Sequence, residues 1–273
     1  DSMLGDVTTP ERMDVVSSQG YAWGYIGSCV PFIICLVLVL FGENFGLGQL
    51  DAIRISFVIT AVWWVVFSVP VLKNVHQTHY KERTEHLFRD ALVGLWATAK
   101  RIFADKRVFM FMLAFFFYID AVNTVISMST SYGAELGIDS TQLVVALLVT
   151  QFVAFPCAIL YGRMAGRFGC KAMIVAAVVA YMCIVFFAAF FLVSAAQFWI
   201  LAILVGMFQG GIQALSRSYY GKIIPKDHAN EYYGFYDIFG KTASILGTFL
   251  VATTTSITGN ASLGVLSIAI LLV

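Results

Sequence analysis

The sequence predicts an all-α fold: a polytopic bundle of helices that cross a lipid bilayer. Of the 273 residues, 60% are hydrophobic and only 12% are charged, whereas a soluble domain is about half apolar and about a quarter charged. The apolar residues form about eight segments, most of them as long as the roughly 20 residues that a helix needs to cross the bilayer core. Tyr and Trp lie at several ends of these segments, as in the aromatic belts at membrane interfaces.

Polar turns set the limits of these segments. The predicted spans cover residues 18–42, 53–72, 108–131, 143–164, 172–194, 198–219 and 233–255, with an eighth span beginning near Ala261. Residues 1–16 are polar and predict a loop. The chain starts at Asp1 rather than at a Met, and the residues after Gly259 are too few for a span, so we expect a fragment of a longer protein.

The longest polar stretch, residues 73–107, separates the second and third predicted spans. It is rich in Lys and Arg, and the apolar residues Leu87, Leu95 and Ile102 recur at helical spacing. This pattern predicts an amphipathic helix that lies on the membrane surface. We interpret the stretch as a tether between two halves of the protein, with lipid sensing as the alternative.

The basic residues predict how the bundle is oriented. They fall on alternate connections between the spans, and the side that carries almost all of them is predicted to be cytoplasmic. The residues on that side are Arg12, the Lys and Arg residues of 73–107, Arg163, Arg167, Lys171, Arg217, Lys222 and Lys226. The opposite side carries Arg54.

Asp120 is the first candidate for a functional residue, because an ionisable side chain inside a span faces a bundle interior or a water-filled cavity. At 1.5 Å per residue, it lies about 20 Å into the bilayer. Asn123 and Thr124 share its helix face, and Tyr118 lies nearby. Asp120 is a candidate for taking up and releasing a proton. The alternative is a structural acid, hydrogen-bonded to a neighbouring helix or paired with Lys241.

Two further pairs of polar residues interrupt the sixth and seventh predicted spans. Gln209 and Gln213 lie four residues apart, as do Asp237 and Lys241, so each pair shares a helix face. We interpret the two Gln side chains as lining a cavity rather than filling a core. The Asp and Lys either face a substrate or neutralise each other locally, and both interpretations stay open.

The sequence predicts no metal, no cofactor, no nucleic-acid partner and no enzyme activity. His76, His79 and His86 lie in the polar stretch without a Cys or carboxylate ligand set, so we interpret them as solvated loop residues. The five cysteines lack CxxC or metal-ligand spacing. Walker, HExxH and nucleophile-elbow motifs are absent from the sequence.

Several stretches resemble one transporter family. The turn GRMAGRFGCK, residues 162–171, resembles the Gly-x-x-x-Gly-Arg-x-Gly-Arg/Lys turn of the major facilitator superfamily. The stretches VSSQGYAWGYIGS, FFFYIDAVNTV and GGIQALSRSYYGKIIP, with EYYGFYDIFGK, resemble the vacuole effluxer branch, the autophagy-related amino-acid exporters, and its bacterial permease relatives. Members of the branch often carry Gln where this chain has Asn123.

The resemblance implies an incomplete fold of the major facilitator type, in which the spans correspond to helices five to twelve of a twelve-helix transporter. Residues 1–75 would be the last two spans of the N-terminal half. Residues 76–106 would be the cytoplasmic connector, and residues 107–273 the C-terminal half, with its last span truncated. The motif and one later residue imply a cytoplasmic gate, whose members would be Gly162, Arg163, Gly166, Arg167, Lys171 and Arg217. Anchoring at the cytoplasmic surface is the alternative role for the basic members.

The resemblance also implies a function: secondary active transport of small polar solutes, amino acids among them, by alternating access between two six-helix halves. The implied partners are the lipid bilayer, a small-molecule substrate and protons, and the implied state is a monomer. A bacterial plasma membrane is the expected location, or a vacuolar membrane if the chain is eukaryotic. The alternative is a non-transporting scaffold or receptor whose basic connector binds lipid or a partner.

Overall fold

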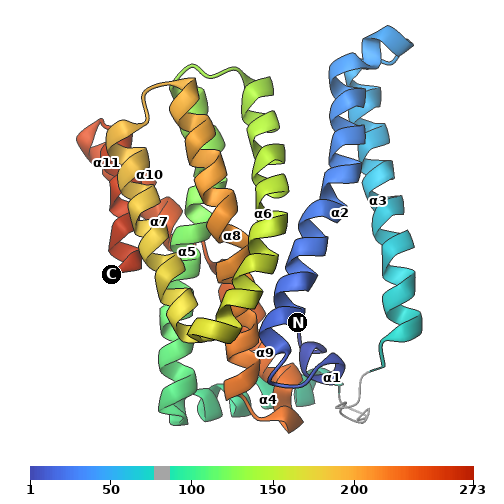
Figure 1. Cartoon of the computed structure of the whole chain (residues 1–273), viewed down its shortest axis with the longest axis vertical. Helices are drawn as coiled ribbons and strands as arrows, with labels where there is room; N and C mark the ends of the chain where they lie inside the picture. Colours follow the sequence, from blue (N-terminus) through green and yellow to red (C-terminus); the bar gives the residue numbers. More distant parts are fainter. Residues whose placement is uncertain (77–86) are drawn as a thin grey trace.

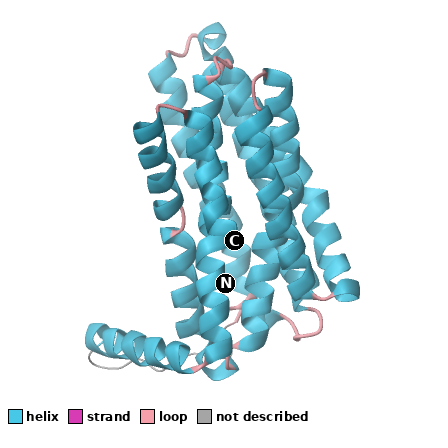
Figure 2. Cartoon of the chain, turned by 90° about the vertical axis from the view of Figure 1, so that its left-hand side faces the viewer, coloured by secondary structure: helices cyan, strands magenta, loops and turns pink. Residues whose placement is uncertain are grey.

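The protein is helical throughout the residues that the computed structural model describes, 1–76 and 87–273, with side chains described through 76 and from 93 onward. Figure 1 shows a bundle of roughly parallel helices, and neither view shows a strand within those ranges (Figures 1 and 2). The predicted all-α membrane bundle is confirmed. Six of the described helices are long and apolar enough to cross a membrane. These are α2 (Met13–Phe41, continued by η1, Gly42–Phe45), α3 (Gln49–Asn74), α5 (Lys106–Glu135), α6 (Ser140–Phe168), α7 (Cys170–Phe191) and α8 (Ala195–Ile223).

The ends of these helices follow from local sequence chemistry. Side-chain oxygens of Asp105 and Asp139 accept hydrogen bonds from the first free backbone N–H groups of α5 and α6. Gly169 ends α6 and Gly259 ends α10 with positive φ angles of 87° and 66°, which only glycine adopts freely. The six spans therefore begin and end within a few residues of the predicted limits.

The N-terminal segment differs from its prediction. Residues 1–16 were expected to form a loop, but α1 covers Leu4–Val7 and α2 already begins at Met13. The first turn of α2 buries Met13 and Asp14. The polar composition of this segment hid the helix, because two of its acidic residues, Asp1 and Asp14, pair with basic residues of α8.

The seventh predicted span is not one helix. It consists of α9 (Ala229–Thr242) and α10 (Ile245–Thr258), separated at Ser244, whose φ of 103° lies in the left-handed region. The eighth segment forms α11 (Ala261–Ser267) and η3 (Ile268–Leu272). The about eight predicted segments thus correspond to six long helices and two further helical segments, the first of which is broken at Ser244.

The end of α4 and the helices after it share one apolar core, with buried residues that run from Ile102 to Leu272. Within it α8 packs closely on α6, because glycines bring the two backbones together. A Cβ atom at Gly206 would lie 2.7 Å from the carbonyl oxygen of Thr150, and one at Gly210 would lie 2.9 Å from the Cβ of Ala158. No real side chain fits at such distances, so the glycines are required where α6 and α8 touch.

The α2–α3 hairpin is packed differently. α2 contacts α6 and α8, whereas α3 packs mainly against α2 and stands at the edge of the molecule (Figure 1). Phe57, Trp64 and Leu72 on α3 are 74%, 74% and 79% exposed. Such an apolar outer surface suits contact with lipid chains or with further membrane helices.

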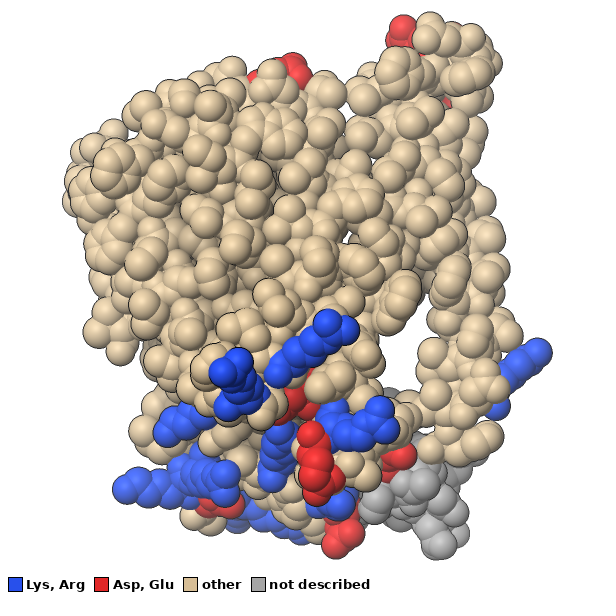
Figure 3. All heavy atoms as spheres, in the orientation of Figure 1, with Lys and Arg blue, Asp and Glu red and all other residues tan. Residues whose placement is uncertain are grey.

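One end of the bundle carries most of the Lys and Arg residues (Figure 3). The helix α4 (Leu87–Ala104) lies across this end and packs on α5 and α9 (Figures 1 and 2). Lys and Arg side chains gather at the same end, and the upper part of the visible face shows none (Figure 3). We call it the basic end; it is the end predicted to be cytoplasmic. His76 is exposed there, whereas His79 and His86 lie outside the described residues.

We predict that Gly206→Ala lowers the free energy of unfolding by about 1–3 kcal/mol, the usual penalty for overpacking. The added methyl group would meet backbone, which cannot rotate away. Thermal unfolding in detergent measures the effect. Gly24→Ala is the matched control, since nothing lies within 4 Å of its added Cβ. It should leave stability unchanged or raise it by about 0.5–1 kcal/mol. Equal midpoints for the two variants would refute the close approach of α6 and α8.

Candidate functional site

A polar cavity of about 230 Å³ lies between α2, α5, α8 and α9. Four residues singled out from the sequence line it: Asn123, Gln213, Asp237 and Lys241. The full lining is Asp1, Tyr21, Phe115, Ile119, Asn123, Gln213, Tyr236, Asp237, Gly240 and Lys241. The structure therefore brings together residues from three helices that the sequence could only place on separate spans.

The two amides of this polar cavity are held in place by neighbouring helices. The Asn123 amide nitrogen donates to the carbonyl oxygen of Gly240 at 3.3 Å, which joins α5 to α9. The Gln213 amide oxygen accepts from the Tyr25 hydroxyl at 3.2 Å, which joins α8 to α2. The wall between them is aromatic, with the rings of Phe115 and Tyr236 stacked 4.2 Å apart.

The two charged residues from α9 in the polar cavity, Asp237 and Lys241, are not paired with each other. Asp237 and Lys241 lie one turn apart on α9, where Asp237 is half-buried and Lys241 is exposed. The salt bridges within the described chain do not join these two side chains. The polar cavity thus presents a carboxylate and an ammonium group that are not neutralised by each other, which does not favour a purely local pair.

Arg217 contacts two residues that line the polar cavity, Tyr21 and Asp1. Its Nε donates to the hydroxyl of Ser17 at 3.0 Å, and its Nη2 donates to the carbonyl oxygen of the same residue at 3.0 Å. The guanidinium carbon lies 4.7 Å from the ring centroid of Tyr21, and Nη1 forms an ion pair of 2.9 Å with Asp1. One predicted gate residue therefore links α8 to α2 directly.

Next to Arg217 lies a contact that the sequence analysis missed. On α2, Asp14 accepts from the Ser218 hydroxyl at 2.7 Å and from the Lys222 ammonium at 2.6 Å, both on α8. We call these three residues the α2–α8 latch. The available signal was the four-residue spacing of Ser218 and Lys222, which puts a hydroxyl and a cation on one face of α8.

The other predicted gate residues play different parts. Gly162 lets α6 approach α2, because a Cβ there would lie 2.6 Å from the Cβ of Ser18. Gly166 has open space around it. Arg163, Arg167 and Lys171 are exposed, and the ion pairs of the described residues do not include them.

Asp120 holds the break between α9 and α10. Its buried carboxylate accepts from the backbone N–H of Gly247 at 2.8 Å and of Leu246 at 3.2 Å, and from the Thr124 hydroxyl at 3.2 Å. The first N–H groups of a helix have no partner within the helix, and a carboxylate there also suits the helix dipole. Asp120 is thus hydrogen-bonded to a neighbouring helix, α10, as expected for a structural acid. Lys241 is not its partner.

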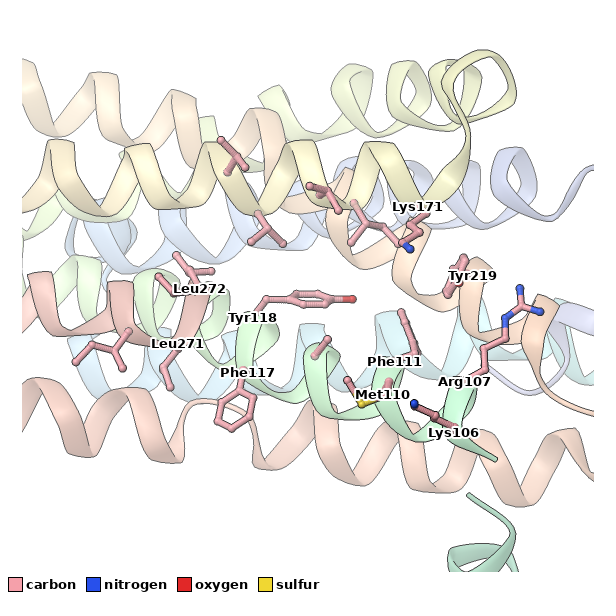
Figure 4. A pocket seen from close by; sticks show the side chains of 17 residues that line it. Lys106, Arg107, Met110, Phe111, Phe117, Tyr118, Lys171, Tyr219, Leu271 and Leu272 are labelled. Atoms are coloured by element: carbon pink, nitrogen blue, oxygen red, sulfur yellow. The ribbon is translucent and has the colours of Figure 1, made fainter. Parts of the chain in front are cut away.

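Tyr118 and Gln209 lie outside the polar cavity. The Tyr118 hydroxyl lies 2.6 Å from the Ser216 hydroxyl, and its ring borders a groove of about 1010 Å³ along α5, α7 and η3 (Figure 4). Lys106, Arg107 and Lys171 stand at one end of that groove and Leu271 and Leu272 at the other (Figure 4). Its lining is mainly apolar, which suits lipid chains or a helix rather than a polar solute. Gln209 borders a much smaller cavity between α5, α6 and α8.

Comparisons with known proteins agree with this architecture. Residues 5–273 match the family described as "Vacuole effluxer Atg22 like". The chain is 48% identical over 275 residues to an uncharacterized MFS-type transporter, YxiO, of Bacillus subtilis, covering 100% of this chain and 64% of that protein. It is 24% identical over 290 residues to autophagy-related protein 22 of Saccharomyces cerevisiae, covering 92% of this chain and 54% of the yeast protein.

The chain therefore spans a little over half to two-thirds of the length of these relatives. Their descriptions name a transporter of the major facilitator type and an autophagy-related protein, and the six long apolar helices agree with an integral, multi-pass membrane location. Because the family match runs over nearly all of its residues, the chain belongs to the family of Atg22-like vacuole effluxers.

Proposed function

We propose that the protein carries small zwitterionic solutes, amino acids among them, across the membrane by alternating access. One observation supports this most: the polar cavity holds a carboxylate, an ammonium group and two amides between helices from both ends of the chain. A free amino acid carries the complementary pair of charges. Lys241 would bind its carboxylate and Asp237 its ammonium group, while Asn123 and Gln213 fix its orientation by hydrogen bonds.

Alternating access needs an interface that can open, and the contact between α2 and α8 supplies one. α2 belongs to the part of the chain before the connector, and α8 to the part after it. Beside the polar cavity, Arg217 and the α2–α8 latch join the two helices by hydrogen bonds and one ion pair. Breaking these contacts would open the polar cavity toward the basic end.

A lipid-binding role for the connector is the second candidate. On α4, Trp96 and Phe103 are 67% and 68% exposed, and the Lys100 ammonium lies 5.8 Å from the ring centroid of Trp96. Exposed aromatic rings beside cations suit a membrane interface. If the protein were only a scaffold, scrambling α4 would abolish its function and the polar cavity variants below would be silent.

We expect Lys241→Gln and Asp237→Asn to raise KM for amino acids about tenfold to a hundredfold, because each removes a charge-assisted contact of about 1.5–3 kcal/mol. Uptake into proteoliposomes that hold the full-length protein measures this. Competition by simple amines and simple carboxylates separates the two roles: Asp237→Asn should abolish inhibition by amines, and Lys241→Gln inhibition by carboxylates. Lys226→Gln and Asp227→Asn, exposed charges of the same signs outside the polar cavity, are the matched controls. If they weaken transport as much, the site is misplaced.

Opening of the α2–α8 interface can be followed with a native thiol. Cys170 is buried beside the α2–α8 latch, with its sulfur 3.8 Å from the Ser218 hydroxyl. Lys222→Ala removes the ion pair to Asp14, so we expect faster maleimide labelling of Cys170 in a protein whose other cysteines are replaced. Charge exchange, with Asp14→Lys and Lys222→Asp combined, should restore slow labelling. Labelling at the wild-type rate in the single variant would show that these residues do not close the interface.

Proton coupling through Asp120 is part of the proposal and has its own test. Asp120→Asn keeps one side-chain oxygen as an acceptor for the N–H groups at the start of α10 but cannot release a proton. We expect flux through this variant to lose its dependence on an imposed pH gradient. Unchanged pH dependence, with only a lower unfolding midpoint, would assign Asp120 a purely structural role.

A further inference from the structure

A second, smaller cavity lies inside the helices that follow the connector. Its volume is about 40 Å³, and α5, α6 and α8 enclose it. Polar lining comes from Ser129, Thr150, Gln151 and Gln209, whereas the other lining residues are apolar or small. Gln151 and Gln209 lie near the middle of their helices, and therefore near the middle of the membrane.

Two amide oxygens at this cavity have no hydrogen-bond partner. Gln209 is only 8% exposed, and its Oε1 atom is buried without a donor. The Oε1 atom of Gln151 is also buried without a hydrogen-bond donor. An unpaired polar atom in a dry interior destabilises a protein by roughly 1–3 kcal/mol, so two of them at one cavity call for an occupant that satisfies both.

The two hydroxyl groups at the cavity also offer only lone pairs. The Ser129 hydroxyl already donates to the carbonyl oxygen of Ile126 at 2.8 Å. The Thr150 hydroxyl is directed at the carbonyl oxygens of Ala146 and Ala202, at 2.9 and 3.2 Å. Each hydroxyl has one proton, so what remains on both oxygens is acceptor capacity.

Four residues that line the cavity thus carry side-chain oxygens with acceptor capacity left. A water molecule has two protons, so it can satisfy only two of these oxygens. A cation satisfies all four oxygens at once, as carbonyl oxygens do when they replace the hydration shell of an ion.

We infer that this cavity is a binding site for a sodium ion, held by oxygens of α5, α6 and α8. Its volume exceeds the roughly 10–15 Å³ that one small occupant needs and is far below that of the polar cavity, so it excludes an amino acid. The ion would tie together three helices of the same half of the chain. The inference does not depend on the proposed substrate, because the two cavities have no lining residue in common.

Thermal unfolding of the purified full-length protein, in sodium chloride and in choline chloride of equal concentration, tests the site directly. A ligand that binds the folded state raises the unfolding midpoint with its concentration, so we expect a rise in sodium that choline does not produce. Gln209→Leu and Gln151→Leu should each abolish the difference between the two salts. Identical midpoints for the wild type in both salts would overturn the site and leave water as the occupant.

Two further variants keep the test sharp if the leucine variants fold poorly. Gln209→Glu supplies a formal negative charge, and we expect it to respond to sodium at least tenfold lower in concentration. A water-filled cavity predicts no sodium response from Gln209→Glu. Tyr181→Phe is the matched control, because Tyr181 carries another buried hydroxyl without a partner but does not line the cavity. Loss of the sodium response in Tyr181→Phe would also contradict the assignment.

Discussion

Hydrocarbon offers no hydrogen-bond partner, so every polar group inside the bilayer must be satisfied within the protein. The break between α9 and α10 is the strongest case. Interrupting a helix frees N–H groups that lipid cannot satisfy, and the Asp120 carboxylate on α5 accepts from two of them, those of Leu246 and Gly247. A buried carboxylate without donors would destabilise the protein, and so would unpaired N–H groups at a helix break. Here each supplies the hydrogen-bond partner of the other. The start of α10, and with it the break that follows α9, depends on this contact.

The need to satisfy polar groups within the protein also separates apolar from polar contacts between the helices. The helices after the connector share an apolar core and approach closely at glycines such as Gly206, a packing that does not readily come apart. Near the basic end, α2 meets α8 through Ser17, Asp14 and their hydrogen-bond partners. Groups of this kind can exchange a protein partner for water when the interface is wetted. The boundary between the two parts of the chain thus combines these polar contacts of α2 with α8 and a close approach of α2 to α6 at Gly162.

Much of the fold could be predicted from the sequence, because the length of an apolar segment and the distribution of Lys and Arg are local properties. They indicated the all-α class, the positions of six spans and the basic end. The motif at residues 162–171 indicated the superfamily, and the stretches that resemble vacuole effluxers indicated the family. The break at Ser244 could not be predicted. Neither Gly nor Pro marks it, and the residue that stabilises it, Asp120, lies more than a hundred positions away in the chain.

The candidate site was predictable only in part, for a related reason. Polar residue types inside spans pointed to Asn123, Gln213, Asp237 and Lys241, but which of them share a cavity is set by how helices pack. Gln209 illustrates the limit, since it lies one turn from Gln213 and yet borders a different cavity. The assignment of the site residues to transport therefore stays a prediction until the variants are measured.

The discontinuity at Ser244 has a mechanical consequence. α9 ends before Ser244 and is hydrogen-bonded to α8 at two points. The Tyr233 hydroxyl donates to the Arg217 carbonyl oxygen, and the Tyr220 hydroxyl donates to the Tyr232 carbonyl oxygen. In the proposed transport cycle, a solute bound by Asp237 and Lys241 would therefore act on α8 through α9, at the turn that carries Arg217. The start of α10 would meanwhile stay hydrogen-bonded to α5.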